Sequence, residues 1–323
     1  MKRINLLACA VAAALAIPAA AWPFGTIYGL GQSGEHERIT RAGLAGFGFG
    51  GRTMDQIAGR RGSFGAVGAP DNPARGLMSA ASAHCDGADT FNVAGYPQSA
   101  SQARVRLEAC RTLIRSNLDT AVLAAGRLDD ATGHIDDAQV PTLIPCVFLG
   151  RPGRAKCDVL EALGLAFHAS QDFYAHSNWV DRPAAGGISP SNPPGLGRSG
   201  RSPWLDPRLN AAFPAGLITG CYEGTPESLH CTYGDNALRV RHAVLNKDDG
   251  EINLDNLAAP QFGPGTTPRG ALNGNFQRAA RAAVEDTHDK WAWFEDQVRT
   301  RYGVSRGRVI LCVVLNDRPD VCR

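Results

Sequence analysis

The sequence has no Cys-x-x-Cys pair, so a zinc site built from closely spaced cysteines is excluded. After residue 21 it also has no apolar run long enough to cross a bilayer, which excludes a transmembrane segment in that part. An excess of basic charge is missing too: without Lys2 and Arg3, 31 Lys and Arg remain against 31 Asp and Glu. Charge therefore gives no reason to expect nucleic acid as an obligatory partner.

Residues 1–21 have the pattern of a cleavable secretory signal. Lys2-Arg3 precede a core rich in Leu, Ala and Val, and the segment ends in three alanines, Ala19 to Ala21. A lipoprotein signal ending at Cys9 is the alternative, but the apolar run before that cysteine is too short. We therefore expect a secreted or periplasmic protein whose mature chain begins at Trp22.

Removal of Cys9 with the signal would leave eight cysteines, an even number that predicts four disulfides in an oxidising compartment. Eight cysteines allow about 105 pairings, so the sequence leaves the connectivity open. Three pairs of cysteines lie close together along the chain and would each close a short loop, which leaves the other two cysteines as a fourth pair. The suggested pairs are Cys146 with Cys157, Cys221 with Cys231, Cys312 with Cys322, and Cys85 with Cys110.

Residues 22–323 are enough for one large domain, and their apolar periodicity predicts a mainly α-helical fold. Residues 182–220 are an exception, because many Pro and Gly residues predict an irregular insert there. A small β element is expected near the C-terminus, from the apolar run at 308–315. Helices are expected to begin near Gly34 and to span 54–58, 101–128, 161–181 and 275–301.

The most informative stretch is the expected helix 161–181. His168, Asp172 and His176 recur every four residues, so they project from one face of that helix. Imidazole and carboxylate groups are ligands that zinc prefers, and a helix holds them in fixed register. The simpler alternative is a bundle helix whose polar side chains face water. Three ligand-type residues in register within an apolar, aromatic segment favour the metal site.

Residues 168–181 resemble the core motif of the Het-C-like family. Their sequence is His-Ala-x-Gln-Asp-Phe-Tyr-Ala-His-Ser-Asn-Trp-Val-Asp. That family looks like distant kin of zinc-dependent phospholipase C and the P1/S1 nucleases. The resemblance implies a multi-helix fold with long loops and a cluster of up to three zinc ions. It also implies hydrolysis of a phosphodiester substrate, which would be a phospholipid at a membrane surface or, less favoured, a nucleic acid.

The same resemblance assigns a metal ligand set. Asp172 would bridge two ions, and Asp71, His84 and His168 would complete the first of them. Trp22, through its α-amino group and carbonyl, would hold the second ion with His36. The third ion would bind His176 and His242, but Asn246 stands where the phospholipase C pattern has an acid, so Asp181 or Asp248 would have to compensate.

Several of these residues could instead have ordinary structural roles. His36 could cap or decorate a helix, Asp71 could be a helix cap, and His84 could sit on a loop. We expect His134 to be solvated and His288 to be a packed or capping residue.

The favoured function is a secreted zinc-dependent phosphodiester hydrolase, phospholipase C-like, in which Asp172, and Asp71 as a ligand or a general base, act in catalysis. A non-catalytic interaction or toxin-associated module, and a P1/S1-like nuclease, are the alternatives.

Overall fold

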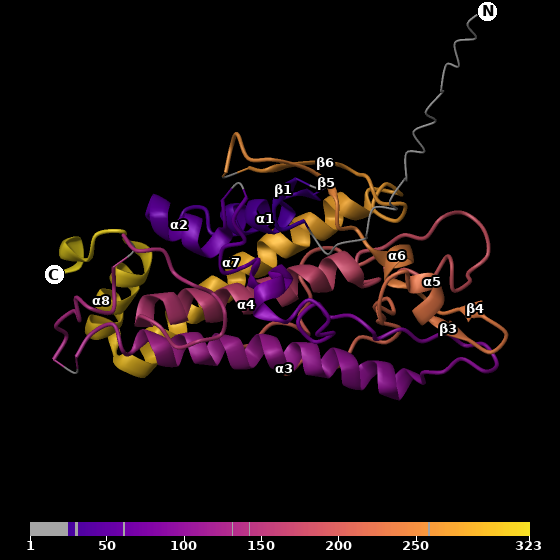
Figure 1. Cartoon of the computed structure of the whole chain (residues 1–323), viewed down its shortest axis with the longest axis horizontal. Helices are drawn as coiled ribbons and strands as arrows, with labels where there is room; N and C mark the ends of the chain where they lie inside the picture. Colours follow the sequence, from indigo (N-terminus) through magenta and orange to yellow (C-terminus); the bar gives the residue numbers. More distant parts are fainter. Residues whose placement is uncertain (1–24, 30–31, 61, 131, 142, 258) are drawn as a thin grey trace, which may run out of the picture.

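The computed structural model describes residues 25–29, 32–60, 62–130, 132–141, 143–257 and 259–323, and the fold is mainly helical (Figure 1). This confirms the expected fold class. The α-helices of the described part are α1 (Glu35–Gly43), α2 (Gly51–Ala58), α3 (Ala100–Ala125), α4 (Ala155–His176), α5 (Glu227–His230), α6 (His242–Leu245), α7 (Asn275–Tyr302) and α8 (Val304–Leu315). Short 3-10 turns are η1 (Ala69–Asp71), η2 (Pro73–Arg75) and η3 (Pro319–Cys322).

Helix α4 lies at the centre of the molecule. Every residue from Ala155 to His176 except Asp158 is buried, so no side of this helix faces water. The long helices α3 and α7 pack along it, and all three follow the long axis of the molecule (Figure 1). A helix buried on all sides must place its polar residues against polar partners from neighbouring elements.

The N-terminal elements close one side of this core. Helix α1 packs on α7 and also touches α4, while α2 and η1 contact α4 directly. Ile39 of α1 and Ile57 of α2 are fully buried in the same apolar core as Phe167 of α4. This packing brings His36 and Asp71 next to the polar side chains of α4.

The β structure of the described residues consists of three short antiparallel hairpins. The largest is in the C-terminal third, where Ile252 pairs with Phe262. The hairpins are β1 (Tyr28–Gly29) with β2 (Gln32–Ser33), β3 (Thr232–Tyr233) with β4 (Ala237–Leu238), and β5 (Gly250–Asn253) with β6 (Gln261–Gly265).

The strand predicted at residues 308–315 is wrong, because this segment belongs to helix α8. A short run of β-branched and leucine residues is compatible with either structure, so periodicity could not separate them. Ile310, Leu311, Val313 and Val314 are buried, and α8 packs against α7. Packing on a neighbouring helix therefore decided the conformation.

Four disulfides join the pairs suggested by closeness along the chain: Cys85–Cys110, Cys146–Cys157, Cys221–Cys231 and Cys312–Cys322. Four bridges fit a protein that folds in an oxidising compartment. Among the described helices, none has both the length and the apolar character needed to cross a membrane.

The insert at 182–220 contains no helix or strand, as predicted. It is nevertheless held firmly against the end of α4. Leu196 and Gly197 donate backbone hydrogen bonds to Asn178 and Asp181, and Trp204 is buried in the core. The insert is therefore part of the packed structure at the C-terminal end of α4.

Candidate metal centre

The polar face of α4 predicted from its four-residue repeat exists, and it is fully buried. His168, Asp172 and His176 all have 0% exposure. Histidines and acids from α1, η1, α6 and two loops converge on them. The structure thus brings together residues separated by more than 200 positions in the sequence.

Asp172 is the centre of this arrangement, because its two oxygens face different histidines. Oδ2 lies 2.9 Å from Nδ1 of His84 and 3.0 Å from Nε2 of His168. Oδ1 lies 3.1 Å from Nε2 of His36 and 3.9 Å from Nε2 of His176. A carboxylate in this position can bridge two cations, each with its own imidazole ligands.

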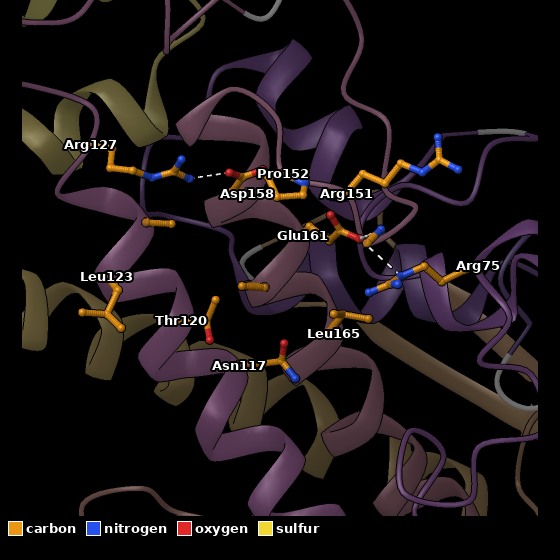
Figure 2. A pocket seen from close by; sticks show the side chains of 13 residues that line it. Arg75, Asn117, Thr120, Leu123, Arg127, Arg151, Pro152, Asp158, Glu161 and Leu165 are labelled. Atoms are coloured by element: carbon orange, nitrogen blue, oxygen red, sulfur yellow. Dashed lines mark hydrogen bonds and ion pairs between the residues drawn. The ribbon is translucent and has the colours of Figure 1, made fainter.

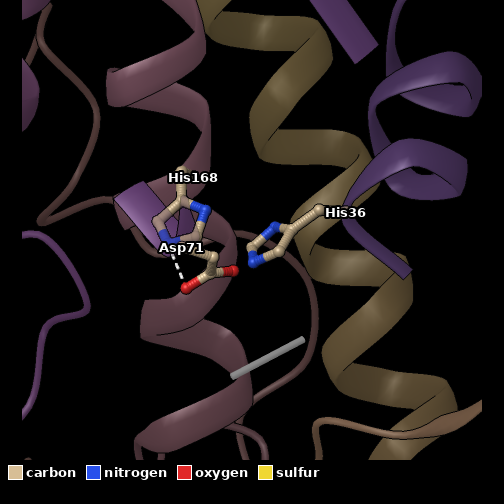
Figure 3. Close-up of side chains that lie close together, drawn as sticks. All are labelled: His36, Asp71 and His168. Carbon is tan, nitrogen blue, oxygen red and sulfur yellow. Dashed lines mark ion pairs between the residues drawn. The ribbon is translucent and has the colours of Figure 1, made fainter. Parts of the chain in front are cut away.

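Asp71 completes the group around His84 and His168. Its Oδ1 atom lies 3.8 Å from Nδ1 of His84 and 3.9 Å from Nε2 of His168, while Oδ2 accepts a hydrogen bond from Thr26. The ligand atoms of His36, Asp71 and His168 all lie within 4.8 Å of one another, and Figure 3 shows these side chains converging. The ligand atoms of His84, His168 and Asp172 satisfy the same limit.

A further group surrounds His176 and His242. Asp248 lies between them, with Oδ1 3.1 Å from Nε2 of His176 and Oδ2 3.4 Å from Nε2 of His242. Asp86 approaches Nδ1 of His176 to 3.2 Å, and Glu227 approaches Nδ1 of His242 to 3.4 Å. These carboxylates surround the two histidines and supply the acidic groups that Asn246, the residue at the position of the expected acid, does not.

The other residue considered as a substitute for that acid, Asp181, has a different role. Its carboxylate forms buried ion pairs with Nζ of Lys247 at 2.9 Å and with Nε of Arg269 at 2.8 Å. Lys247 also donates hydrogen bonds to the backbone oxygens of Ser177 and Leu245. This network fixes the segment that carries Asp248 against the end of α4.

Hydrogen bonds outside the cluster orient three of the histidines. Nδ1 of His36 lies 2.7 Å from Oε1 of Gln171, and Nε2 of His84 lies 3.2 Å from the backbone oxygen of Leu77. Nδ1 of His176 lies 2.9 Å from the backbone oxygen of His84. When these nitrogens carry the proton, the other ring nitrogen presents a lone pair toward Asp172 in His36 and His84 and toward Asp248 in His176. This is the usual arrangement around metal-binding histidines.

Burial and charge shift the pKa values within the cluster. Burial would raise the pKa of Asp172, but the surrounding histidines, above all His168 and His176, hold it well below its usual range. Burial lowers the pKa of His84, but the hydrogen bond to Asp172 and the charge of Asp71 outweigh it and raise the value to about 9. The pKa of His168 is lowered, mainly by burial and also by the charge of His36. The carboxylate of Asp172 is therefore kept ionised by the positive charge of its neighbours.

Several buried atoms of the cluster form no hydrogen bond of good geometry. They include both oxygens of Asp248, both ring nitrogens of His242, Nε2 of His176, Nδ1 of His168, and one oxygen each of Asp86 and Asp172. Unpaired buried polar atoms are costly, but cations satisfy such oxygens and nitrogens together. The mixture of imidazole and carboxylate fits a divalent transition metal such as zinc. The cluster could therefore hold metal ions.

The remaining predicted residues fall outside this cluster or outside the described part. Trp22 lies outside the described residues. His134 is solvated, with 85% of its side chain exposed, as expected. His288 is 54% exposed and contacts the ring of Phe47, so it is a surface residue packed on an aromatic neighbour. Comparison with protein-family models, curated proteins and solved structures found no match for this chain.

Four polar residues of the site were missed by the sequence interpretation: Thr26, Asp86, Gln171 and Glu227. Asp86 had a signal, since it follows His84 by two residues. Gln171 lies next to Asp172 within the recognised stretch. Thr26 and Glu227 reach the site only through the tertiary fold, and no local pattern marks them.

Proposed function

We propose that this protein is a secreted zinc-dependent hydrolase of phosphodiester bonds, similar in type to phospholipase C. The observation that carries this proposal is the position of Asp172, whose two oxygens each face a separate histidine group. Paired metal sites that share a carboxylate are suited to clamp a phosphate between two cations. The outer hydrogen-bond partners of His36, His84 and His176 also favour the tautomers that ligands require.

Each residue then has a defined role. Asp71, His84, His168 and Asp172 would hold the first ion, and Asp172 would also be a ligand of the second. Asp71 is better placed as a ligand than as a general base, because Thr26 occupies its Oδ2 and its Oδ1 faces the cluster.

His36, together with the amino terminus expected at Trp22, would hold the second ion. His176, His242 and Asp248 would hold a third, with Asp86 beside them. Bound zinc would lower the pKa of a coordinated water and stabilise charge on the phosphate oxygens.

A second candidate is a structural metal centre in a non-catalytic interaction module. The favouring observation is burial: His36, His168, Asp172 and His176 all have 0% exposure. A metal that only binds the folded state would stabilise such a module without turnover.

Elemental analysis combined with hydrolysis assays tests these functions. The substrates are phosphatidylcholine, bis(p-nitrophenyl) phosphate and single-stranded DNA, and the proteins are wild type, His168→Ala and the surface control His134→Ala. We expect bound zinc and phosphodiesterase activity in wild type and control, and loss of both in His168→Ala.

The outcomes separate the candidates. Bound zinc without turnover of any substrate would favour the structural centre, and activity confined to DNA would favour a nuclease. Full zinc content in His168→Ala would contradict the proposed site.

A further inference from the structure

A short loop near the N-terminal end of α4 exposes an unusual amount of apolar surface. This apolar loop comprises residues 143–149. Leu143 is 75% exposed, Ile144 65% and Val147 70%. Single exposed apolar residues are ordinary, but three large ones within five positions of one loop indicate an interaction surface.

The apolar loop is held in place by covalent and polar contacts. The Cys146–Cys157 disulfide ties it to α4, and the backbone nitrogen of Cys146 donates to Oε1 of Gln56 at 2.7 Å. Nη2 of Arg154 donates to the backbone oxygen of Ile144 at 2.5 Å. The apolar side chains are therefore presented on a preorganised support, which reduces the entropy lost on binding.

The chain segment that carries this loop has basic but no acidic residues. Residues 138–157 contain no Asp or Glu, whereas Arg151 and Arg154 follow the apolar loop directly. A pocket of about 520 Å³ opens beside it, between α3, α4 and residues 150–152 (Figure 2). Its apolar wall includes Leu123 and Leu165.

The arginines at this pocket are not all neutralised. Arg75 pairs with Glu161 at 3.3 Å, and Arg127 pairs with Asp158. Arg151, at the rim, has no ion pair among the residues that the structure describes, and Figure 2 shows its side chain extending away from the Arg127–Asp158 pair. The two acids of the pocket are thus already matched, and a free positive charge remains beside the apolar loop.

We propose that the apolar loop and the arginine rim at Arg151 form a docking surface for a lipid bilayer with anionic headgroups. Leu143, Ile144 and Val147 would enter the boundary between headgroups and acyl chains, and Arg151 would contact the headgroup charge. Residues 138–157 add no negative charge to this surface, and Asp55, which lines a pocket with residues 145–149, is paired with Arg41 at 2.7 Å. The docking surface contacts α4 at Asp158–Leu165, and it does not require that the metal centre be catalytic.

Vesicle co-sedimentation tests the proposal with the full chain, on phosphatidylcholine vesicles with and without phosphatidylglycerol. Wild type should bind the anionic vesicles more tightly, and added salt should weaken that binding. The double variant Leu143→Ser/Ile144→Ser should bind at least about tenfold more weakly. Arg151→Glu should lose several-fold in binding to anionic vesicles while leaving the apolar loop intact.

Leu229→Ser is the matched control, because Leu229 is 72% exposed on α5, far from the apolar loop (Figure 1). It should bind vesicles as wild type does. Circular dichroism and zinc content should be unchanged in all three variants. A loss of vesicle binding can then be distinguished from a loss of metal binding.

Two outcomes would overturn the proposal. One is equal vesicle binding by wild type, the double variant and Arg151→Glu. The other is a wild-type dimer that the double variant converts to monomer, with no vesicle binding by either; the patch would then be an interface between two copies of this chain.

Discussion

Gln171 fixes the geometry of the candidate metal centre although it is not one of the proposed ligands. Its Oε1 accepts from Nδ1 of His36, and its Nε2 donates to the hydroxyls of Thr40 and Thr287, each at 3.0 Å. All of these groups are buried. The side-chain amide therefore fixes the ring of His36 so that its Nε2 atom points to Asp172.

We expect Gln171→Leu to weaken metal binding about 10–100-fold, because loss of an outer hydrogen-bond partner frees the ligand ring. Gln171→Glu keeps an acceptor for His36 and should weaken binding less. Competition titration with a chromogenic chelator measures both affinities. Equal affinities in wild type and Gln171→Leu would show that His36 is not a ligand held by this contact.

Site residues could be predicted from the sequence when they lie close together in one local motif. His168, Asp172 and His176 were predicted from spacing alone, because a helix converts a four-residue repeat into one face. Asp71, His84, His36 and His242 were predicted by resemblance, and the structure places them beside His168, Asp172 or His176. Glu227 was missed because its approach to His242 depends on the tertiary placement of α5.

Helix α4 approaches the segment before η1 so closely that only glycine fits at position 164. A Cβ atom there would overlap the backbone carbonyl carbon of Ala66. This close approach also places η1, with Asp71, beside the polar face of α4. The glycine thus connects helix packing with the position of a ligand.

Gly164→Ala should destabilise the protein by about 1–3 kcal/mol through overpacking, although alanine is the better helix former. Zinc affinity should fall with it, because Asp71 would be displaced. Gly51→Ala in α2, where a Cβ meets no atom within 4 Å, is the control and should be as stable as wild type or slightly more stable. Urea denaturation of both variants measures the difference, and an equal stability for Gly164→Ala and wild type would contradict the packing argument.

Lys156 at the start of α4 gives this element a specific pH dependence. It is 1% exposed, and its Nζ atom donates to the backbone oxygen of Asn316 at 2.6 Å. Burial lowers its pKa to about 8 although the charge of Asp317 opposes the shift. Between that value and the ordinary pKa of 10.5, the unfolded chain binds a proton that the folded chain has lost.

Stability at this residue must therefore rise with pH across that window. Relative to Lys156→Met, the wild-type free energy of unfolding should increase by about 3 kcal/mol between about pH 8 and about pH 10.5. Urea denaturation of both proteins over this range provides the values. A difference independent of pH would show that Lys156 keeps its proton when buried.

The long helices were predictable because their apolar periodicity extends over many turns, as in α3 and α7. Helix α8 was not predictable, because a continuous run of seven apolar residues shows neither the helical nor the strand period. Its packing on α7 favours the helix. The complete burial of α4 was also unforeseen, because it depends on loops and on the insert that pack around its C-terminal end.

The molecule as a whole combines four disulfides with a buried centre rich in acids, whose negative charge a bound cation would offset. Metal that binds only the folded state adds about 2.7 kcal/mol per site at a free concentration a hundredfold above Kd. For a chain of this size, removal of one such ion should lower Tm by about 4 °C.

Differential scanning calorimetry before and after chelation measures the shift, with elemental analysis to show that the metal is gone. Re-addition of zinc should restore the original Tm. An unchanged Tm in protein shown to be free of metal would mean that the cluster is stable through its own ion pairs.

The central claim is that Asp172 bridges two metal ions, and anomalous diffraction at the zinc absorption edge tests it most directly. The account predicts two peaks, each about 2.0–2.2 Å from one oxygen of Asp172. One peak should lie beside His84 and His168, and the other beside His36. A zinc-containing crystal with no peak at bonding distance from Asp172, in which these histidines keep their direct contacts to its carboxylate, would contradict the account.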